Sequence, residues 1–159
     1  MPTIELNLEI RAPVERVFDL SRSIELHMAS TDQTGEQAIA GRTSGLIELG
    51  EEVTWRARHF GVRQTLTSRI TAYDRPHHFR DSMVRGAFKR FDHDHYFTAR
   101  RQCTQLREVF SFEAPFGFLG AMANGLFLTR YMHRFLCGRA RCIKEAAESD
   151  TWRLYLNDE

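Results

Sequence analysis

Two histidines stand two positions apart in the run FDHDHYF, residues 91–97. Side chains alternate between the faces of a strand, so His93 and His95 share one face with Phe91 and Phe97. The phenylalanines predict that this face points inward, which would leave the two imidazoles about 7 Å apart at Cα. Such a pair could bind a metal ion, move protons, orient a ligand in a pocket, or simply be satisfied by its neighbours.

A metal site would need a third ligand from another part of the chain. His59 is one candidate, and His27, His77 and His78 are others. No carboxylate or cysteine stands at a companion spacing in the sequence. The sequence therefore favours no metal site and predicts no cofactor.

A carboxylate in HHFRDSM, residues 77–83, could act together with these histidines. Phe79, Asp81 and Met83 share one face of the predicted strand. An inward Asp81 could accept a hydrogen bond from His93 or His95 on the next strand, and such a pair can move protons. This would suit a cyclase, a dehydratase or a hydrolase. Alternatively, Asp81 faces solvent and pairs with an arginine.

The run VTWRARHF, residues 53–60, offers two opposite assignments. Trp55 and His59 share one face, and Arg56 and Arg58 share the other. If the first face lines a cavity, Trp55 supplies a flat apolar wall and His59 a polar tip. The opposite assignment would place the two arginines inside as groups that bind an anion, and a third interpretation makes Trp55 ordinary core.

Alternating and helical periods define the elements that must position these residues. Short connections between successive strands predict an antiparallel meander, and the order of elements predicts an α+β fold. Strands are expected at 3–11, 37–40, 51–60, 62–73, 77–86, 86–99 and 104–115, with helices from Pro13, at 24–29 and from about 118 to 148.

The last helix carries an apolar stripe that includes Met122, Leu126 and Phe135. Such a stripe is usually core, but methionine also suits a pocket that adapts to varied ligands. We expect one domain over residues 1–149 and a separate tail at 150–159. The tail would fray, pack on a neighbour, or dock a partner protein through Trp152.

Composition excludes several classes of function. The 159 residues carry a net charge of +1, which predicts no nucleic-acid partner. The three cysteines have no disulfide spacing and, with no signal peptide, predict reduced thiols and a cytoplasmic protein. No apolar stretch reaches about 18 residues, so we expect no membrane span. Motifs for dinucleotides, phosphate loops and the serine-hydrolase elbow are missing.

The order of elements resembles the START/Bet v 1-like superfamily, also called SRPBCC or polyketide cyclase-like. The resemblance covers residues 3–148 and is closest to a bacterial branch labelled cell division inhibitor-like or ligand-binding SRPBCC. It rests on VTWRARHFG (53–61), HHFRDSMVRGAFKRFDHDHYF (77–97) and FSFEAPFGFLGAMANGLFLTRYMHRFLCGRARCIKE (110–145). It implies a helix-grip fold, in which a curved antiparallel sheet wraps a long C-terminal helix and a ligand cavity lies between them.

We therefore predict a protein that binds a small hydrophobic or aromatic molecule, lipid-like or polyketide-like. His59, Asp81, His93 and His95 would orient the ligand. The alternative is a cyclase or dehydratase that uses the cavity histidines, with Asp81, as general acid and base. A homodimer is left open. The predicted apolar walls are Trp55, Phe79, Met83, Phe91, Phe97 and Phe112, under a roof of Met122, Leu126 and Phe135.

Overall fold

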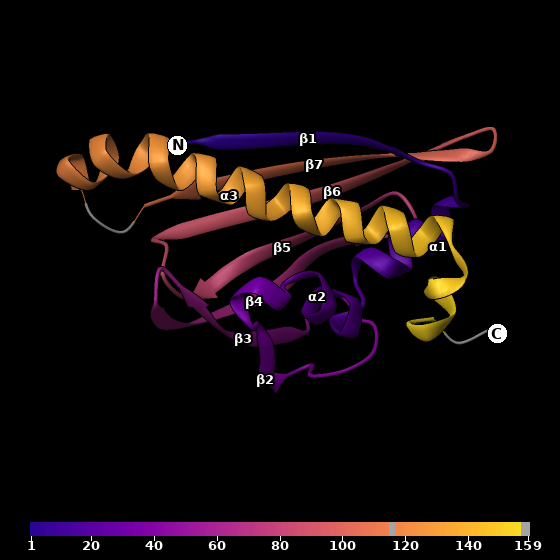
Figure 1. Ribbon diagram of the computed structural model, residues 1–159, viewed down its shortest axis with the longest axis horizontal. Helices are drawn as coiled ribbons and strands as arrows, with labels where there is room; N and C mark the ends of the chain where they lie inside the picture. Colours follow the sequence, from indigo (N-terminus) through magenta and orange to yellow (C-terminus); the bar gives the residue numbers. More distant parts are fainter. Residues whose placement is uncertain (115–116, 157–159) are drawn as a thin grey trace.

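The computed structural model describes residues 1–114 and 117–156, with the side chains of residues 117–124 excepted. One seven-stranded antiparallel sheet and one long helix account for most of it (Figure 1). The strands are β1 (Thr3–Ile10), β2 (Gln37–Gly41), β3 (Glu52–His59), β4 (Val62–Asp74), β5 (His78–Arg85), β6 (Arg90–Arg100) and β7 (Cys103–Glu113). The helices are α1 (Val14–Ser21), α2 (Ile24–Ser30) and α3 (Gly117–Glu148), with short 3-10 turns η1 (Asp32–Thr34) and η2 (Asp150–Leu154).

The sheet is a meander with one strand added. Its order is β1-β7-β6-β5-β4-β3-β2, so β2 to β7 pair with their sequence neighbours and β1 joins the free edge of β7. The β3–β4 hairpin turns through Phe60 and Gly61 alone, and both have positive φ, 52° and 74°. Two central residues with positive φ match the right-handed twist of the flanking strands. The short connections that predicted a meander therefore do produce one.

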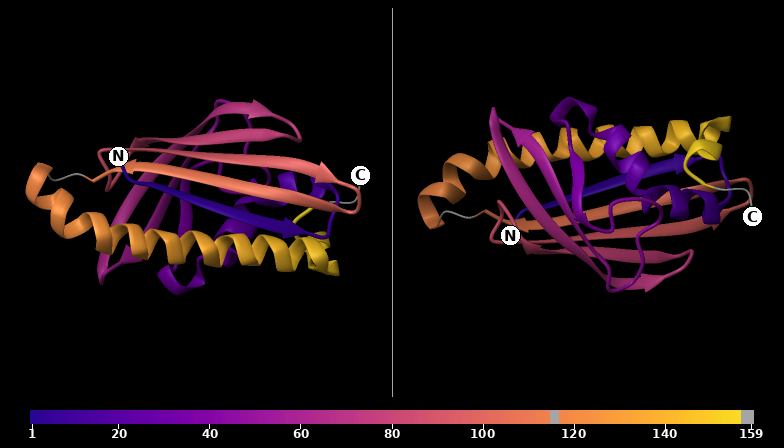
Figure 2. Two further views of the ribbon diagram at one scale, coloured as in Figure 1. Left: turned by 90° about the horizontal axis from the view of Figure 1, so that it is seen from above. Right: turned by 90° about the horizontal axis from the view of Figure 1, so that it is seen from below.

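The helices cover one face of the sheet. The two views in Figure 2 show α3 running along the curved sheet. In Figure 1, α1 lies near the end where β1 stops, and α2 follows it toward the middle of the molecule. The side chain of Ser23 caps α2 by accepting a hydrogen bond from the backbone N–H of Leu26, at 3.2 Å. This arrangement confirms the predicted α+β helix-grip architecture.

Two clusters of apolar side chains fill much of the space between sheet and helices. In the first, the ring of Phe18 on α1 makes edge contacts with Tyr73, Phe79 and Phe97, at centroid distances of 5.1 to 5.5 Å. The second joins β6 and β7 to α3 and contains Phe91, Phe110, Phe112, Met132 and Leu136. Together the clusters anchor both ends of the sheet's inner face.

The chain after α3 packs against the body of the protein. Trp152 and Leu156 contact the first cluster, and the Arg16 guanidinium lies 4.3 Å from the centre of the Trp152 ring. Leu154 is exposed. Among the described residues, no helix is long and apolar enough to cross a membrane.

Candidate functional site

Four ionisable side chains meet on the inner face of the three strands β5, β6 and β7. His93 and His95 on β6 are 2% and 1% exposed. Asp81 on β5 pairs in register with His93, and Glu108 on β7 pairs with His95. Because β6 lies between the other two strands, its inward side chains meet inward side chains from both sides.

The two imidazoles lie between the same two carboxylates. His95 Nδ1 is 3.2 Å from Glu108 Oε1, and His95 Nε2 is 3.3 Å from Asp81 Oδ1. His93 has looser contacts, because its Nδ1 is 3.7 Å from Asp81 Oδ1 and its Nε2 is 3.8 Å from Glu108 Oε2. The two rings lie 3.9 Å apart at their centroids. The result is a compact cluster of two acids and two imidazoles.

Burial and mutual attraction oppose each other in this cluster. Burial raises the pKa of Asp81 and Glu108, but the neighbouring imidazoles outweigh it and hold both carboxyl pKa values below their usual range. Burial lowers the pKa of His95, yet the two carboxylates outweigh it and raise that pKa. Burial and the charge of His95 lower the pKa of His93. The two carboxylates therefore favour a proton on His95, whereas burial and the neighbouring His95 disfavour one on His93.

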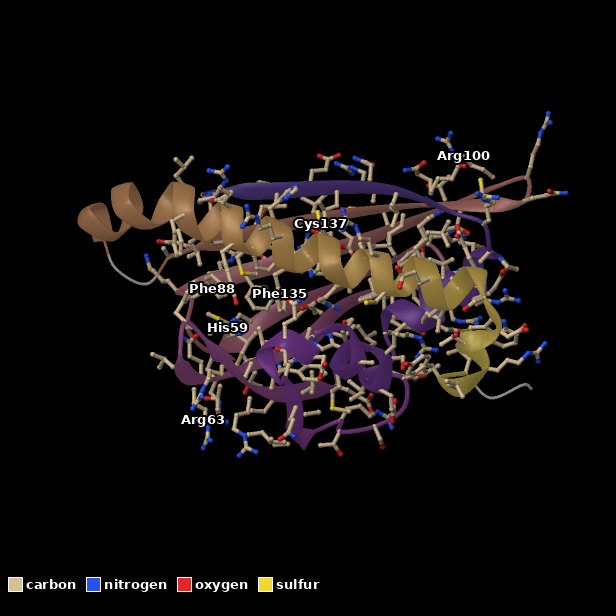
Figure 3. All side chains as sticks on the ribbon, in the orientation of Figure 1. His59, Arg63, Phe88, Arg100, Phe135 and Cys137 are labelled. Carbon is tan, nitrogen blue, oxygen red and sulfur yellow. The ribbon has the colours of Figure 1, made fainter. Side chains whose placement is uncertain are left out.

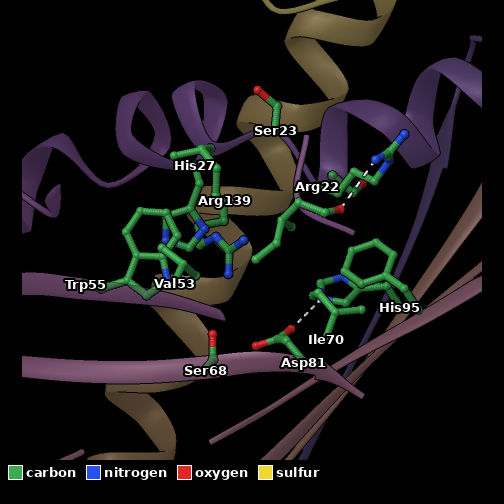
Figure 4. A pocket seen from close by; sticks show the side chains of 14 residues that line it. Arg22, Ser23, His27, Val53, Trp55, Ser68, Ile70, Asp81, His95 and Arg139 are labelled. Atoms are coloured by element: carbon green, nitrogen blue, oxygen red, sulfur yellow. Dashed lines mark hydrogen bonds and ion pairs between the residues drawn. The ribbon is translucent and has the colours of Figure 1, made fainter. Parts of the chain in front are cut away.

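A small cavity of about 50 Å³, lined by both polar and apolar side chains, borders this cluster (Figure 4). Asp81 and His95 line it on the sheet side, while His27, Trp55 and Arg139 line it from α2, β3 and α3. The Nε of Arg139 is buried and has no hydrogen-bond partner among the described residues. This space suits a few water molecules or one small ion, and it is too small for an organic ligand.

A second cavity of about 380 Å³ lies between strands β3 and β4, the β5–β6 connection and α3. In Figure 3, His59, Phe88 and Phe135 mark the region between sheet and helix where it lies. The rings of Phe60 and Phe127 lie 5.5 Å apart and both are exposed, so they mark its mouth. Much of the remaining wall is apolar: Ala57, Leu66, Phe88, Leu128, Met132 and Phe135. The volume falls within the usual range for small-molecule sites.

Polar groups in the larger cavity come in pairs. The hydroxyl of Tyr131 lies 2.6 Å from Nδ1 of His59. Burial lowers the pKa of His59 and raises that of Tyr131, so both groups stay neutral near pH 7 and the hydroxyl can donate to the imidazole. Glu36 accepts a hydrogen bond from His27, at 2.9 Å. The cavity thus has mostly apolar walls and two polar corners, one formed by His59 and Tyr131 and the other by Glu36.

The predicted ligand residues divide between the two cavities and the core. Trp55, His59 and Phe135 line the larger cavity, while Phe79, Asp81, His95 and again Trp55 line the smaller. His93 and His95 are outside the lining of the larger cavity, where they were expected to orient a ligand. The prediction of one common pocket is corrected to two spaces that share Trp55.

Several predicted walls are filled core instead. Phe91, Phe97 and Phe112 are packed by other aromatic rings, and Met83 packs against the second cluster. The roof prediction for Leu126 is wrong, because this residue is 80% exposed. Met122 lies outside the residues whose side chains are described.

The structure also decides between the alternative assignments made for the polar residues. Asp81 contacts the two imidazoles rather than an arginine, and Arg56 and Arg58 are exposed. Three of the histidines considered as a third metal ligand have other partners. His27 bonds to Glu36, His59 to Tyr131, and His78 to Asp94.

Glu108 was not among the residues predicted from the sequence, although a signal for it exists. It shares its strand face with Leu106, Phe110 and Phe112, so strict alternation places it inside. Glu36 stands in a loop before β2 and carries no such signal. Arg139 does carry one, because Leu136 and Ile143, three positions before it and four after it in α3, are buried, and this helical spacing puts Arg139 on the same face.

No protein-family model matches the chain, and no curated protein matches it. Solved structures do match. Protein TTHA0849 from Thermus thermophilus has a TM-score of 0.74 at 17% identity, over 92% of this chain and 97% of that one. A START superfamily protein from Mycobacterium smegmatis has a TM-score of 0.69 at 11% identity, over 92% and 97%. The chain has the START/Bet v 1-like helix-grip fold.

A plant protein shares the helix-grip fold with this chain as well. Major latex-like protein 151 from Panax ginseng has a TM-score of 0.65 at 15% identity, over 93% of this chain and 98% of that one. Identities this low establish the fold alone, so the helix grip accounts for where the two cavities lie and leaves their ligands to be argued from their own residues.

Proposed function

We propose that this protein binds a small, largely hydrophobic molecule, lipid-like or polyketide-like, in the 380 Å³ cavity. The cavity itself is the observation that carries the proposal, because its volume and its apolar walls suit such a ligand. Phe60 and Phe127 at the mouth give the ligand an apolar route in. The shared helix-grip fold supports the same interpretation.

The charges of the cavity narrow the ligand's chemistry. No lysine or arginine lines it among the described residues, and residues 115–124 contain neither in the sequence. The carboxylate of Glu36 does line it. An anionic ligand would therefore be buried without a partner charge, which costs several kcal/mol. We infer that the ligand is neutral and carries a hydroxyl or amide group that can hydrogen-bond at the polar corners.

The cyclase or dehydratase alternative has less support. Its candidate catalytic groups, Asp81, His93 and His95, are absent from the lining of the larger cavity, as far as the described residues define it. The cavity that Asp81 and His95 do line holds about 50 Å³, which leaves no room for an organic substrate. General acid–base catalysis requires these groups within hydrogen-bond reach of the reacting atoms.

Fluorescence titration with N-phenyl-1-naphthylamine, a neutral apolar probe, tests the binding proposal on the full chain. We expect saturable binding at one site. Ala57→Leu fills part of the cavity and should weaken the binding of the probe about fivefold or more, since displaced volume costs at least about 1 kcal/mol. Ala99→Leu makes the same change at an exposed position and should leave the affinity within about twofold. Equal binding by both variants would place the probe elsewhere and overturn the proposal.

Competition between two ligands of equal chain length tests the charge argument. Decan-1-ol should displace the probe at lower concentration than decanoate, because only the alcohol is neutral. Glu36→Gln removes the opposing charge and should narrow the gap between the two. A preference for decanoate in the wild-type chain would contradict the inferred ligand chemistry, even if the cavity binds the probe.

A further inference from the structure

We propose that Asp81, His93 and His95 form a binding site for one divalent transition-metal ion, with Glu108 as a positioning residue. One ligand atom from each of the three residues lies within 4.8 Å of the others. Two histidines and one carboxylate are ligands that zinc, cobalt and iron accept. The His-x-His spacing supplies two of the ligands, and the carboxylates of Asp81 and Glu108 come from the two strands that flank the histidines.

The distances require little adjustment. Asp81 Oδ1 is 3.3 Å from His95 Nε2 and 3.7 Å from His93 Nδ1. In a tetrahedral zinc site with bonds of about 2.0–2.1 Å, ligand atoms lie roughly 3.4 Å apart. Small rotations of side chains already facing one another would therefore admit an ion between these three atoms.

Glu108 lies on the opposite side of both imidazoles. Its Oε1 is 3.2 Å from His95 Nδ1, and its Oε2 is 3.8 Å from His93 Nε2. Its two oxygens can each accept a hydrogen bond from the N–H of one ring. The other nitrogen of each ring, His95 Nε2 or His93 Nδ1, then points toward Asp81. Carboxylates in this position fix the tautomer and orientation of metal-binding histidines.

An unfinished hydrogen-bond pattern is the second, independent observation. His93 Nε2 and Glu108 Oε2 are both buried, and neither has a hydrogen-bond partner in the described part of the chain. Two buried atoms of opposite character, 3.8 Å apart, would normally close into a bond. An ion at His93 Nδ1 would fix the proton on Nε2 and draw these two atoms together.

Charge balance favours the same occupant. Asp81 and Glu108 place two carboxylates against two imidazoles that are 2% and 1% exposed. A divalent ion carries a charge that matches two carboxylates. The Arg139 guanidinium lines the neighbouring cavity, and its buried Nε has no hydrogen-bond partner among the described residues, so it does not close the cluster through that atom. Paired charges are the condition under which charged groups are tolerated in a protein interior.

The small cavity supplies what a three-ligand site lacks. Asp81 and His95 line this 50 Å³ space, and the side chain of Asp81 is 22% exposed, which gives an ion a route in. Water in the cavity can complete the coordination. The larger cavity plays no part, so failure of the metal site would leave the proposed ligand untouched, and the reverse holds as well.

Titration of the full chain with Co²⁺ and Zn²⁺, after removal of metal by a chelator, tests the site. We expect one equivalent of Co²⁺ with visible absorption of a nitrogen–oxygen site and no thiolate charge-transfer band. Zn²⁺ should bind by calorimetry at one equivalent and raise the unfolding temperature. Binding of less than one equivalent at micromolar protein, or a thiolate band, would overturn the proposal without any variant.

Variants then assign the ligands, with folding checked by circular dichroism. Asp81→Asn and His93→Asn should lose the ion, and Glu108→Gln should weaken it about 10- to 100-fold. His78→Gln changes the ion pair with Asp94 on the other face of the same strands and should have no effect. Cys137→Ser tests a surface alternative, because its sulfur lies 3.7 Å from His133 Nδ1. Loss of binding in Cys137→Ser, or full binding in a folded Asp81→Asn, would refute the site.

Discussion

The indole ring of Trp55 stacks on the imidazole ring of His27, with centroids 4.0 Å apart and planes 17° from parallel. Trp55 lines both cavities, so this stack forms part of the wall between them. Glu36 in turn holds His27 through a hydrogen bond of 2.9 Å. A residue of α2 and a residue before β2 therefore set the position of a side chain on β3 that bounds both spaces.

Replacing Trp55 should affect stability and binding together. Trp55→Ala deletes a buried aromatic ring and should lower the free energy of unfolding by about 3–5 kcal/mol. Trp55→Phe keeps an apolar wall and should cost clearly less. Urea denaturation followed by far-UV circular dichroism measures both without relying on the tryptophan signal. A loss below about 1 kcal/mol in Trp55→Ala would mean that the ring is not packed as described.

Asp94 on the outer face of β6 should make stability depend on pH. It accepts hydrogen bonds from Arg80, both at 2.8 Å, and from His78 at 2.7 Å. Burial raises the pKa of Asp94, but these partners outweigh it and leave that pKa below its ordinary value. The folded-state pKa is thus below the unfolded one, so the stabilising contribution is complete above about pH 4 and is lost as pH falls through the folded value.

Asp94→Asn is the corresponding experiment. At pH 7 it should reduce the free energy of unfolding by about 1–3 kcal/mol, because charged hydrogen bonds are lost. The difference from the wild type should shrink as pH falls below about 4. Asp150→Asn, at a side chain that is 98% exposed, is the matched control and should change little. If the difference in the free energy of unfolding between wild type and Asp94→Asn stays constant down to about pH 2, the charge of the carboxylate is not what stabilises the folded protein.

Two glycines should respond in opposite directions to alanine. A Cβ at Gly138, within α3, would meet no atom within 4 Å, so Gly138→Ala should stabilise by about 0.5–1 kcal/mol through helix propensity. Gly41 ends β2 with a φ of +73°, and a Cβ there would clash with the backbone oxygen of Glu52. Gly41→Ala should therefore destabilise by more than about 1 kcal/mol. Thermal unfolding of both variants tests these two predictions. A change in unfolding temperature of the same sign in both variants would contradict them.

The fold was predictable because its elements have clean periods. Alternation through Ile4, Leu6, Leu8 and Ile10 marked β1, and the short connections indicated the meander. Alternation also placed His93 and His95 inside correctly. These inferences succeed because side-chain direction in a strand follows from position alone.

The division of the interior could not be predicted in the same way. Whether an inward ring fills the core or lines a cavity depends on what faces it across the fold. Phe97 is met by Phe18 from α1, whereas Phe135 faces open space. Leu126 follows the helical stripe but is exposed, because at that point nothing among the described residues covers it. Periodicity predicts which way a side chain points. Packing between distant segments decides whether it then fills the core, lines a cavity or stays exposed.

The hydroxyl of Tyr131 should matter for polar ligands and little for stability. Tyr131→Phe removes the group 2.6 Å from His59 Nδ1 but keeps the ring that packs 4.5 Å from Phe60. Both partners are only partly buried, so the free energy of unfolding should fall by less than about 1 kcal/mol. If the proposed ligand bonds at this corner, decan-1-ol should bind about 3- to 10-fold more weakly, because one hydrogen bond contributes about 0.5–1.5 kcal/mol. N-phenyl-1-naphthylamine should keep its affinity within about twofold. Equal losses for both compounds would indicate a change in the shape of the cavity, and no loss for the alcohol would place its hydroxyl at the Glu36 corner instead.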